Sequence, residues 1–310
     1  MRTSPLLIGT RGSPLALWQA NHVRDLLIAN GLAAGEVGLA VIKTSGDTIQ
    51  DRPLREFGGK GLFTKEIDEA LLASRVDLAV HSMKDLPTEL PSGIAIGATL
   101  RRGDVRDAMI SRDGQSLKQL PLGAVLGTSS LRRQAQIRRL RPDLEIIDFR
   151  GNVETRLRKL DEGKTKATVL ALAGLERLGL TDHVTEIFPT ELMLPAVAQG
   201  AIGVAMRDKD ERVAALLAPL NDAATATAVD CERSFLKELD GSCRTPIAGL
   251  AEIEKDLLRF RGLILTPDGK TWHEVEMAGP AADAARIGGD AGKDLLASAG
   301  PDFLPDFRAG

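Results

Sequence analysis

Aromatic residues and cysteine are scarce in this chain. Tyrosine is absent, aromatics make up 3% of the 310 residues, and only Cys231 and Cys243 carry thiols. Few side chains are therefore available to stack on bases or to form an aromatic cage around a ligand. Two cysteines do not make a disulfide framework, and four scattered histidines lack the spacing of a zinc site. We expect no metal and a reducing compartment.

Long hydrophobic runs and an excess of basic charge are missing as well. The apolar stretch within residues 1–9 is too short for a signal peptide or a membrane span, so we expect a cytoplasmic protein with no membrane partner. The formal net charge of -3 disfavours a general nucleic-acid binder, because affinity for the phosphate backbone needs an excess of lysine and arginine.

What is present is the composition of a globular protein. Hydrophobic residues make up 43% and charged residues 27% of the chain. A length of 310 residues exceeds what one hydrophobic core usually covers, so two or three domains are expected.

Short apolar runs alternate with helical patterns, which predicts α/β domains with mainly parallel strands. In chain order we expect strands at 6–9, 39–44, 77–80, 124–126, 145–149 and 168–172, and helices at 14–29, 65–74, 174–178 and 224–239. The charged stretch 101–104 indicates a crossing between domains. After about Asn221 a helix and a hairpin at 266–269 indicate a small α+β domain.

The strongest local motif is Gly127-Thr-Ser-Ser-Leu-Arg-Arg133, placed where a strand gives way to a helix. A serine or threonine can cap this helix, and the free N–H groups with the positive end of the helix dipole favour a carboxylate or a phosphate. Arg132 and Arg133 add forked donors that bind carboxylates through two hydrogen bonds. The motif therefore predicts an anion site.

A basic region follows this motif. Residues 127–166 hold eleven basic and six acidic side chains, a local excess of +5. We interpret four of the arginines as solvated helix residues paired with acids: Arg138, Arg139, Arg141 and Arg158. Four others lie at or just after strand ends, where ligands collect in open α/β sheets, and are candidates for ligand binding: Arg132, Arg133, Arg150 and Arg156.

Two further segments admit two interpretations each. Lys84 and Asp85 follow a buried strand; Asp85 is either a helix cap or, facing arginines, an ionised group that steadies a cation and passes protons. Lys84 could equally be a salt-bridge partner. The glycine-rich stretch from Thr44 to Phe63 is either a flap over a cleft or a floppy loop.

Cys243 lies in a loop, Asp240-Gly-Ser-Cys-Arg-Thr-Pro246, where its thiol would be accessible and Arg244 would favour the thiolate. A lone cysteine is more often inert, and both interpretations stay open from the residues alone. Cys231 occupies a helical position and is interpreted as structural.

Together these segments resemble the hydroxymethylbilane synthase (porphobilinogen deaminase) family from Ile8 to about Leu265. The stretches that carry the resemblance are Thr10-Arg-Gly-Ser-Pro-Leu-Ala-Leu-Trp-Gln19, Gly58-Gly-Lys-Gly-Leu-Phe63, Ala79-Val-His-Ser-Met-Lys-Asp85, Gly127 to Arg133, Arg150-Gly-Asn-Val-Glu-Thr-Arg156, Ala173-Gly-Leu-Glu-Arg177, Leu194-Pro-Ala-Val-Ala-Gln-Gly200 and the Cys243 loop. Two departures are Gly241-Ser242, where a Gly-Gly pair is common, and Arg55-Glu56, where a more basic pair is expected.

The resemblance implies two periplasmic-binding-protein-like α/β domains with a third, smaller α+β domain. It places domain 1 at 1–100 plus 200–220 with a flap at 45–63, domain 2 at 101–199, and domain 3 at 221–310. It also implies a cleft between the first two domains. A dipyrromethane cofactor, attached covalently through Cys243, would serve as a primer, with no metal or nucleotide.

The implied activity is a transferase of tetrapyrrole (porphyrin and heme) biosynthesis. It deaminates four porphobilinogen molecules, joins them head to tail on the primer and releases hydroxymethylbilane. Asp85 matches the catalytic residue. Cofactor-binding roles fall on Cys243, Lys84, Thr128, Ser129, Ser130, Arg132, Arg133 and Arg150; substrate-binding roles on Arg11, Gln19, Arg156, Arg177 and Gln199; flap roles on Lys60 and Phe63.

The remaining expectations concern the partner, the oligomeric state and two rival functions. Porphobilinogen would be the small-molecule partner, and we expect a monomer. A first rival, a non-catalytic two-lobed anion-binding protein, would share the fold and the arginines but carry no covalent adduct. A second rival, a nucleic-acid regulator using the region from Arg132 to Lys166, is disfavoured by the acidic total and scarce aromatics.

Overall fold

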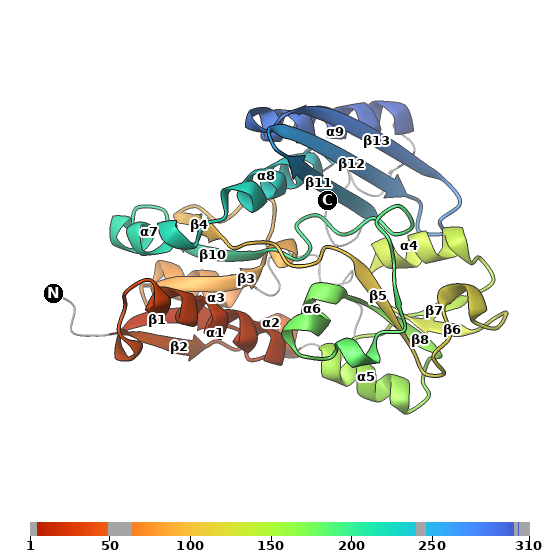
Figure 1. The fold of residues 1–310 in the computed structure, drawn as a ribbon, viewed down its shortest axis with the longest axis horizontal. Coiled ribbons are helices and arrows are strands. Elements are labelled where there is room, and N and C mark those ends of the chain that lie inside the picture. The colour runs from red at the N-terminus through yellow and green to blue at the C-terminus, as the bar shows by residue number, and fades with distance from the viewer. Residues whose placement is uncertain (1–4, 49–63, 240–245, 301–302, 304–310) are drawn as a thin grey trace. The chain divides into compact units, whose positions relative to one another are not determined.

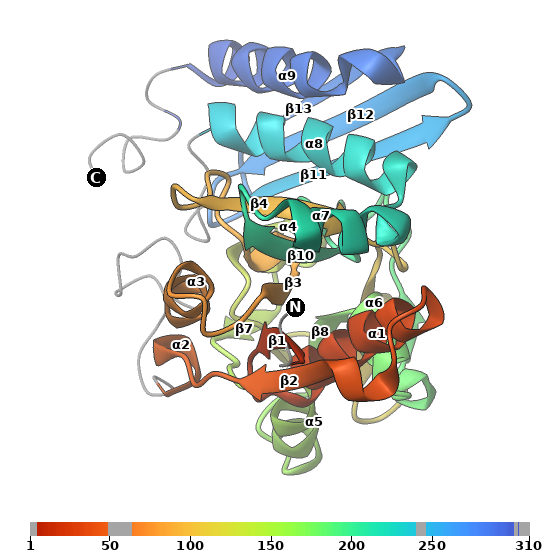
Figure 2. The same ribbon diagram turned by 90° about the vertical axis from the view of Figure 1, so that its left-hand side faces the viewer.

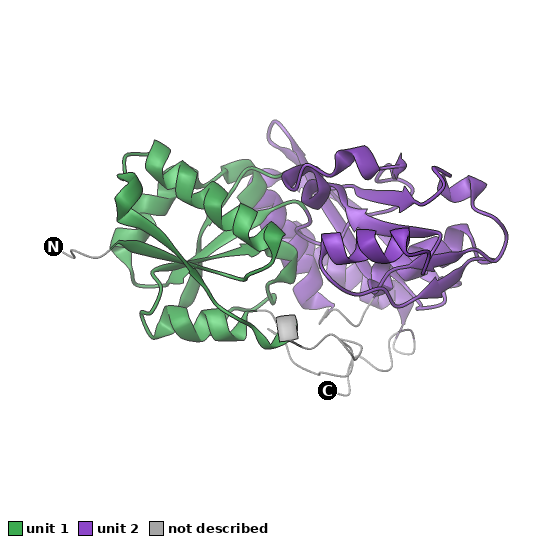
Figure 3. Cartoon of the chain, turned by 90° about the horizontal axis from the view of Figure 1, so that it is seen from below, with its two compact units in different colours: residues 1–52, 58–103, 200–226 green, residues 53–57, 104–199, 227–310 purple. Residues whose placement is uncertain are grey.

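The computed structural model describes residues 5–48, 64–239, 246–300 and 303. Within them it contains two five-stranded sheets and one three-stranded sheet (Figure 1). By contacts the chain forms two compact units (Figure 3). Unit 1 comprises residues 1–52, 58–103 and 200–226, and unit 2 comprises residues 53–57, 104–199 and 227–310.

Unit 1 is built on a mixed sheet with the strand order β2-β1-β3-β10-β4. The strands are β1 (Leu6–Thr10), β2 (Val37–Val41), β3 (Leu78–Ser82), β4 (Ile94–Thr99) and β10 (Ile202–Arg207). The helices are α1 (Pro14–Ala29), α2 (Ser45–Thr48), α3 (Lys65–Leu72) and α7 (Glu211–Leu217), with 3-10 turns at Ala34–Glu36, Met83–Asp85 and Ala218–Leu220. Pairs β1–β2 and β1–β3 are parallel, whereas β10 is antiparallel to both β3 and β4.

Both faces of this sheet are buried. One core joins the sheet to α1 and α7 through Ala20, Val23, Leu27, Val213 and Leu217. The other joins it to α3, whose apolar residues recur at helical spacing: Ile67, Ala70 and Leu71. Covering on both faces explains why the strands are apolar throughout rather than alternating.

Unit 2 begins with a second mixed sheet, ordered β7-β6-β8-β5-β9. Its strands are β5 (Asp107–Ser111), β6 (Val125–Gly127), β7 (Glu145–Ile147), β8 (Ala167–Ala171) and β9 (Glu186–Ile187). Its helices are α4 (Leu131–Leu140), α5 (Val153–Asp161) and α6 (Leu172–Arg177), with 3-10 turns at Leu117–Gln119 and Thr181–His183. Ile137 of α4 packs in the core on one face, and α5 and α6 pack in the core on the other.

The remainder of unit 2 contains an antiparallel sheet, β11 (Ile247–Glu254), β12 (Leu257–Leu265) and β13 (Trp272–Pro280). It follows α8 (Ala223–Glu238) and precedes a 3-10 turn at Ala281–Asp283 and α9 (Ala284–Ala299), which lies along the sheet in Figure 2. Phe235 of α8 packs against Phe260 of β12, with tilted rings whose centroids lie 4.8 Å apart. The hairpin expected at 266–269 joins β12 to β13, with Gly269 at a φ of +71°.

The α/β class and the smaller third sheet are confirmed, but mainly parallel pairing is wrong. Each five-stranded sheet has two parallel and two antiparallel pairs. Periodicity along one strand does not report the direction of its neighbour, and the antiparallel pairs come from β10 and β5, which enter from distant parts of the chain. The division into three domains stays a prediction. In the described residues, the helices are too short or too polar to span a membrane.

Candidate active site

The first group of predicted site residues gathers where β1 and β3 end, in unit 1. Thr10 ends β1, and Ser13 caps α1 by accepting a hydrogen bond from the Ala16 N–H. Pro14 then occupies the first turn, where its missing N–H costs nothing. This sequence of strand, cap and helix leaves Arg11 in the connecting turn.

A small pocket of about 60 Å³ brings three predicted residues together: Arg11, Gln19 and Asp85. Gln19 is buried and its Nε2 donates to Ser82 Oγ at 2.9 Å, which ties α1 to the end of β3. Four other polar residues, which sequence reasoning did not assign to the site, also line it: Ser13, Thr64, His81 and Ser82. The sequence could have indicated them, because each lies at a strand end or a helix start, close to one of the predicted site residues.

His81 is the unusual member of this pocket. It is 6% exposed, and its Nε2 atom is buried without a hydrogen-bond partner in the part of the chain that the structure describes. Burial, reinforced by the positive charge of Arg11, lowers the pKa of His81 to about 4. The imidazole is therefore neutral at physiological pH, where it offers a donor or an acceptor rather than a charge.

Lys84 and Asp85 lie in the 3-10 turn Met83–Asp85 that follows β3, and both are exposed. Met83 is buried and anchors this turn, since its N–H donates to Ala201 O at 3.0 Å. Asp85 is the last residue of the turn and does not begin a helix, so the interpretation as a helix cap is wrong. The structure leaves its carboxylate accessible beside the pocket.

The second group lies in unit 2, where β6 passes into α4. Ser130 is the N-cap of α4 and its Oγ accepts from Arg133 N, which confirms the predicted cap. Thr128 Oγ1 accepts from Ser130 N at 3.3 Å. Ser129 Oγ accepts from Phe149 N at 3.0 Å and so connects this turn to the end of β7.

The guanidinium groups of Arg132 and Arg133 converge on one carboxylate. Nη2 of each arginine lies 2.7 Å from an oxygen of Asp107, Arg132 at Oδ2 and Arg133 at Oδ1. Further donors of both arginines bond to carbonyl oxygens of Leu194 and Val169, at 2.7 and 2.9 Å. Asp107 is fully buried, and the two arginines are only 5% and 6% exposed.

This cluster holds two positive charges against one negative charge. Burial alone would raise the pKa of Asp107, but the charges of Arg132 and Arg133 outweigh it and hold that pKa well below its usual range. Burial lowers the pKa of Arg132, and Asp107 only partly opposes the shift. Removing water from an unbalanced pair of cations is unfavourable, so the site favours an additional anion.

Sequence reasoning missed Asp107. It lies twenty-five residues before Arg132, outside the basic region of residues 127–166. The available signal was a charged residue that opens an otherwise apolar strand, Asp107-Ala-Met-Ile-Ser111. A carboxylate at such a position needs a buried cation as its partner.

Three more predicted arginines are in unit 2. Arg156 is half-buried and its Nε donates to Gly151 O at 2.9 Å. Burial, with repulsion from Arg133 and Arg150, lowers the pKa of Arg156 to about 10, although Asp148 opposes the shift. Arg150 is half-buried, and Arg177 ends α6, where burial lowers its pKa. Arg156 therefore lies within electrostatic range of both Arg133 and Arg150.

Gln199 is fully buried and bonds inward. Its Nε2 donates to Asp107 Oδ1 at 2.9 Å and to Val105 O at 2.8 Å. The preceding residue, Ala198, adopts a left-handed φ of +60°, which is uncommon for a residue with a Cβ. Direct contact of Gln199 with a substrate stays a prediction.

Three of the four arginines set aside from the sequence have acidic partners, as expected. Arg139 pairs with Glu274 at 2.8 Å and lies over the Trp272 ring, and the other two pairs are Arg141–Asp143 and Arg158–Glu162. Arg138 differs, because its Nη1 donates to the Pro267 carbonyl oxygen. These contacts give each of the four arginines a partner on the protein surface.

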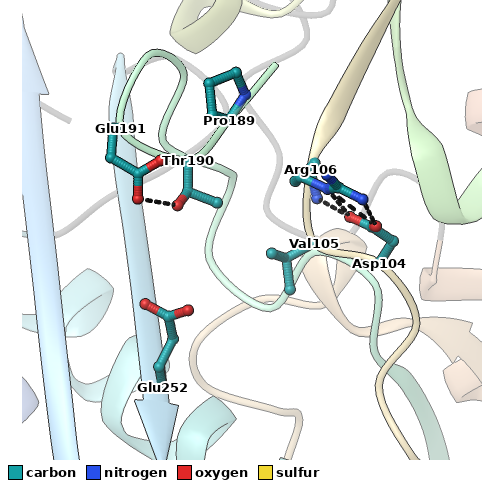
Figure 4. Close-up of a pocket in the computed structure, with 7 residues that line it drawn as sticks. All are labelled: Asp104, Val105, Arg106, Pro189, Thr190, Glu191 and Glu252. Carbon is teal, nitrogen blue, oxygen red and sulfur yellow. Dashed lines mark hydrogen bonds and ion pairs between the residues drawn. The ribbon is translucent and has the colours of Figure 1, made fainter. Parts of the chain in front are cut away.

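A larger pocket of about 500 Å³ in unit 2 contains none of the predicted site residues (Figure 4). Asp104 and Arg106 form an ion pair at 2.6 Å on one side, and Glu191 accepts from Thr190 on the other. Its charged side chains already have protein partners.

Several predictions fall outside the described residues: Cys243, Lys60 and Phe63, with the flap beyond α2. Cys231 is described and fully buried, and burial with neighbouring Glu232 and Asp230 raises the pKa of its thiol to about 12. It is therefore inert, as its structural interpretation requires. Among the described residues, no cluster of His, Cys, Asp or Glu is arranged to hold a metal ion.

Comparisons with known proteins agree on one family. Residues 6–215 match the family model described as porphobilinogen deaminase, dipyromethane cofactor binding domain, and residues 226–297 match porphobilinogen deaminase, C-terminal domain. A relative from Paracoccus denitrificans named porphobilinogen deaminase is 54% identical over 302 residues, which cover 97% of this chain and 96% of that protein.

Similar solved structures are far more distant. The BvgS VFT2 domain of Bordetella pertussis has a TM-score of 0.41 and 13% identity, covering 74% of this chain and 91% of its own. A periplasmic binding protein of Salmonella typhimurium with high arginine specificity has a TM-score of 0.40 and 12% identity, with coverage of 72% and 94%. At this level of similarity neither match assigns a function to this chain.

Proposed function

The chain belongs to the porphobilinogen deaminase family, and from this we propose how its own residues perform the family's reaction. Its activity is that of a transferase of tetrapyrrole biosynthesis: four porphobilinogen molecules are deaminated and joined head to tail on a dipyrromethane primer, and hydroxymethylbilane is released. The assignment of roles to residues is our proposal.

The observation that carries the proposal is the unbalanced cluster in unit 2. Each pyrrole unit bears an acetate and a propionate, so a growing chain brings many carboxylates. Among the described residues, this cluster sets two buried guanidiniums against one carboxylate, an excess of one positive charge. Such a cluster fits a cofactor with acid side arms.

We assign the cofactor's acid side arms to Arg132, Arg133 and Arg150, supported by Lys84, Thr128, Ser129 and Ser130. When bound, dipyrromethane supplies the pyrrole α-carbon that is extended, and we place its covalent attachment at Cys243. The helix dipole at Ser130 adds to the attraction for anions at the start of α4.

The incoming porphobilinogen is assigned to Arg11, Gln19, Arg156 and Arg177. Asp85 is accessible at the rim of the pocket that Arg11 and Gln19 line. Its carboxylate stabilises the positive charge that develops at the pyrrole N–H as ammonia leaves, and accepts a proton when the new carbon–carbon bond is complete. We place the enzyme in the cytoplasm as a monomer and assign Lys60 and Phe63 to a flap.

Intact-mass measurement tests the proposal most directly. Purified protein should exceed its sequence mass by two pyrrole units, and Cys243→Ser should lack that increment, while Cys231→Ser should keep it because Cys231 is buried. Asp85→Asn should fold and lose turnover by about 10²- to 10⁴-fold, the usual contribution of a general acid–base group. Active protein of unmodified mass would disprove covalent attachment, and full turnover in Asp85→Asn would place the proton transfer elsewhere.

A further inference from the structure

Asp107, the first residue of β5, contacts both Arg132 and Arg133 of α4. It opens β5, whose neighbour β8 lies between it and β6, the strand that leads into α4. Arg133 donates two hydrogen bonds to Asp107 Oδ1, from Nε at 3.2 Å and from Nη2 at 2.7 Å. Arg132 forms an ion pair with Oδ2 at 2.7 Å. One carboxylate therefore orients two neighbouring guanidiniums.

The carboxylate is itself held in place. Gln199 Nε2 donates to Asp107 Oδ1 at 2.9 Å and to the Val105 carbonyl oxygen at 2.8 Å. The residue before Gln199, Ala198, is fixed by a hydrogen bond from its N–H to Glu232 Oε2 at 2.6 Å. Glu232 is fully buried in α8 and its other oxygen accepts from Ala251 N. The left-handed backbone of Ala198 is thus held by its surroundings.

The arrangement does more than neutralise charge. Among the described residues, Asp107 Oδ2 accepts no well-aligned hydrogen bond and Arg132 Nε donates none. Both are buried polar atoms beside an unbalanced positive charge. A carboxylate that only neutralised charge would be balanced by one cation. Here one carboxylate contacts two guanidinium groups and orients both, so the described cluster keeps an excess of one positive charge.

We infer that Asp107 is a positioning residue for the reaction, with Gln199 as its support: it aims Arg132 and Arg133 so that a carboxylate of the cofactor or the growing chain completes the charge balance of the cluster. This inference rests on the proposed function. It assigns Gln199 an indirect role, through Asp107, in place of contact with substrate.

Asp107→Glu is the informative variant, because it keeps the negative charge and moves the carboxylate by one methylene. It should fold, carry the dipyrromethane mass less completely, raise KM for porphobilinogen and lower kcat/KM by about 10²-fold, the size of effect expected from misplacing a group by about 1 Å. A purely structural defect would instead reduce the amount of folded enzyme and lower apparent kcat with KM unchanged. Asp107→Asn should be worse than Asp107→Glu, since it also removes the charge.

Asp104→Asn is the matched control. Asp104 lies three residues before Asp107, and its carboxylate pairs with Arg106 at 2.6 Å. This variant should retain the KM and the adduct of the unmodified protein.

The outcomes separate the two claims. Unchanged KM and kcat/KM in Asp107→Glu, or loss of folding in both Asp107→Glu and Asp107→Asn, would overturn the positioning role. Absence of porphobilinogen consumption and of added mass in the unmodified protein would instead overturn the proposed function.

Discussion

At the residue scale, the site depends on which side chains are removed from water. Arg132 and Arg139 lie on the same helix, yet the first is buried against Asp107 and the second pairs with exposed Glu274. Solvent screens the second pair, so it contributes little to stability or binding. Burial, more than residue type, therefore separates a binding arginine from a surface arginine.

His81 gives a pH dependence that belongs to a single residue. Its pKa of about 4 in the folded protein lies below the value near 6.5 expected when unfolded. Below pH 6.5 the unfolded chain binds a proton at His81 that the folded protein excludes, and this favours unfolding. The free energy of unfolding is therefore highest above pH 6.5 with respect to His81, and it decreases as the pH falls toward 4. Between pH 7 and pH 5 we expect His81 to lower the free energy of unfolding by about 2 kcal/mol.

Urea unfolding at the two pH values measures this change. His81→Gln should remove about that part of the pH dependence, whereas His183→Gln should preserve it because His183 is exposed. An identical pH dependence in His81→Gln and the unmodified protein would show that His81 is not held neutral.

At the element scale, packing of α8 against α9 depends on two glycines. A Cβ at Gly288 would lie 1.9 Å from the Cys231 carbonyl oxygen, and one at Gly292 would lie 2.6 Å from Glu238 Cβ and 3.1 Å from the Phe235 carbonyl oxygen. Backbone atoms of a neighbouring helix cannot yield as a flexible side chain can. The two helices therefore approach closely because α9 presents glycine at these positions.

Gly288→Ala should destabilise the protein by about 1–3 kcal/mol or more, because inserted atoms force the helices apart. Gly289→Ala is the control on the same helix, since its Cβ would lie 3.6 Å from Glu238 Oε1, an ordinary contact. It should be neutral or stabilising by up to about 1 kcal/mol through helix propensity. Urea unfolding of both variants checks the difference, and equal stabilities would contradict the packing argument.

At the scale of the whole molecule, charge is distributed unevenly. The formal net charge is -3, although residues 127–166 alone carry an excess of +5. Much of that basic charge is either buried with Asp107 or paired on the helix surfaces. The remaining positive field is therefore local, and it suits small anions better than a long polyanion.

We accordingly expect weak binding to duplex DNA, with a dissociation constant above about 10⁻⁴ M at physiological salt. Filter binding across a salt series checks this. Tight affinity that falls steeply with salt would favour the nucleic-acid rival, whereas porphobilinogen consumption by the same preparation supports the enzyme.

The sequence by itself determined most local structure. Apolar spacing predicts the helix that begins at Pro14, the Thr-Ser-Ser motif predicts a serine or threonine cap for α4, and Thr266 to Gly269 predict the hairpin, because such signals depend on residues a few positions apart. The motif residues also carried the resemblance to the family. The bounds of some elements differ from those expected: β2 begins at Val37 rather than at Leu39.

Only the tertiary structure decided which distant residues meet. It paired β10 antiparallel with β3 and β4, placed His81 beside Arg11, and set Asp107 between two arginines and Gln199. Those contacts join residues as far apart in the sequence as Leu78 and Met206, and their energies arise from burial that no local pattern records. The charge balance of the site is consequently a property of the folded molecule.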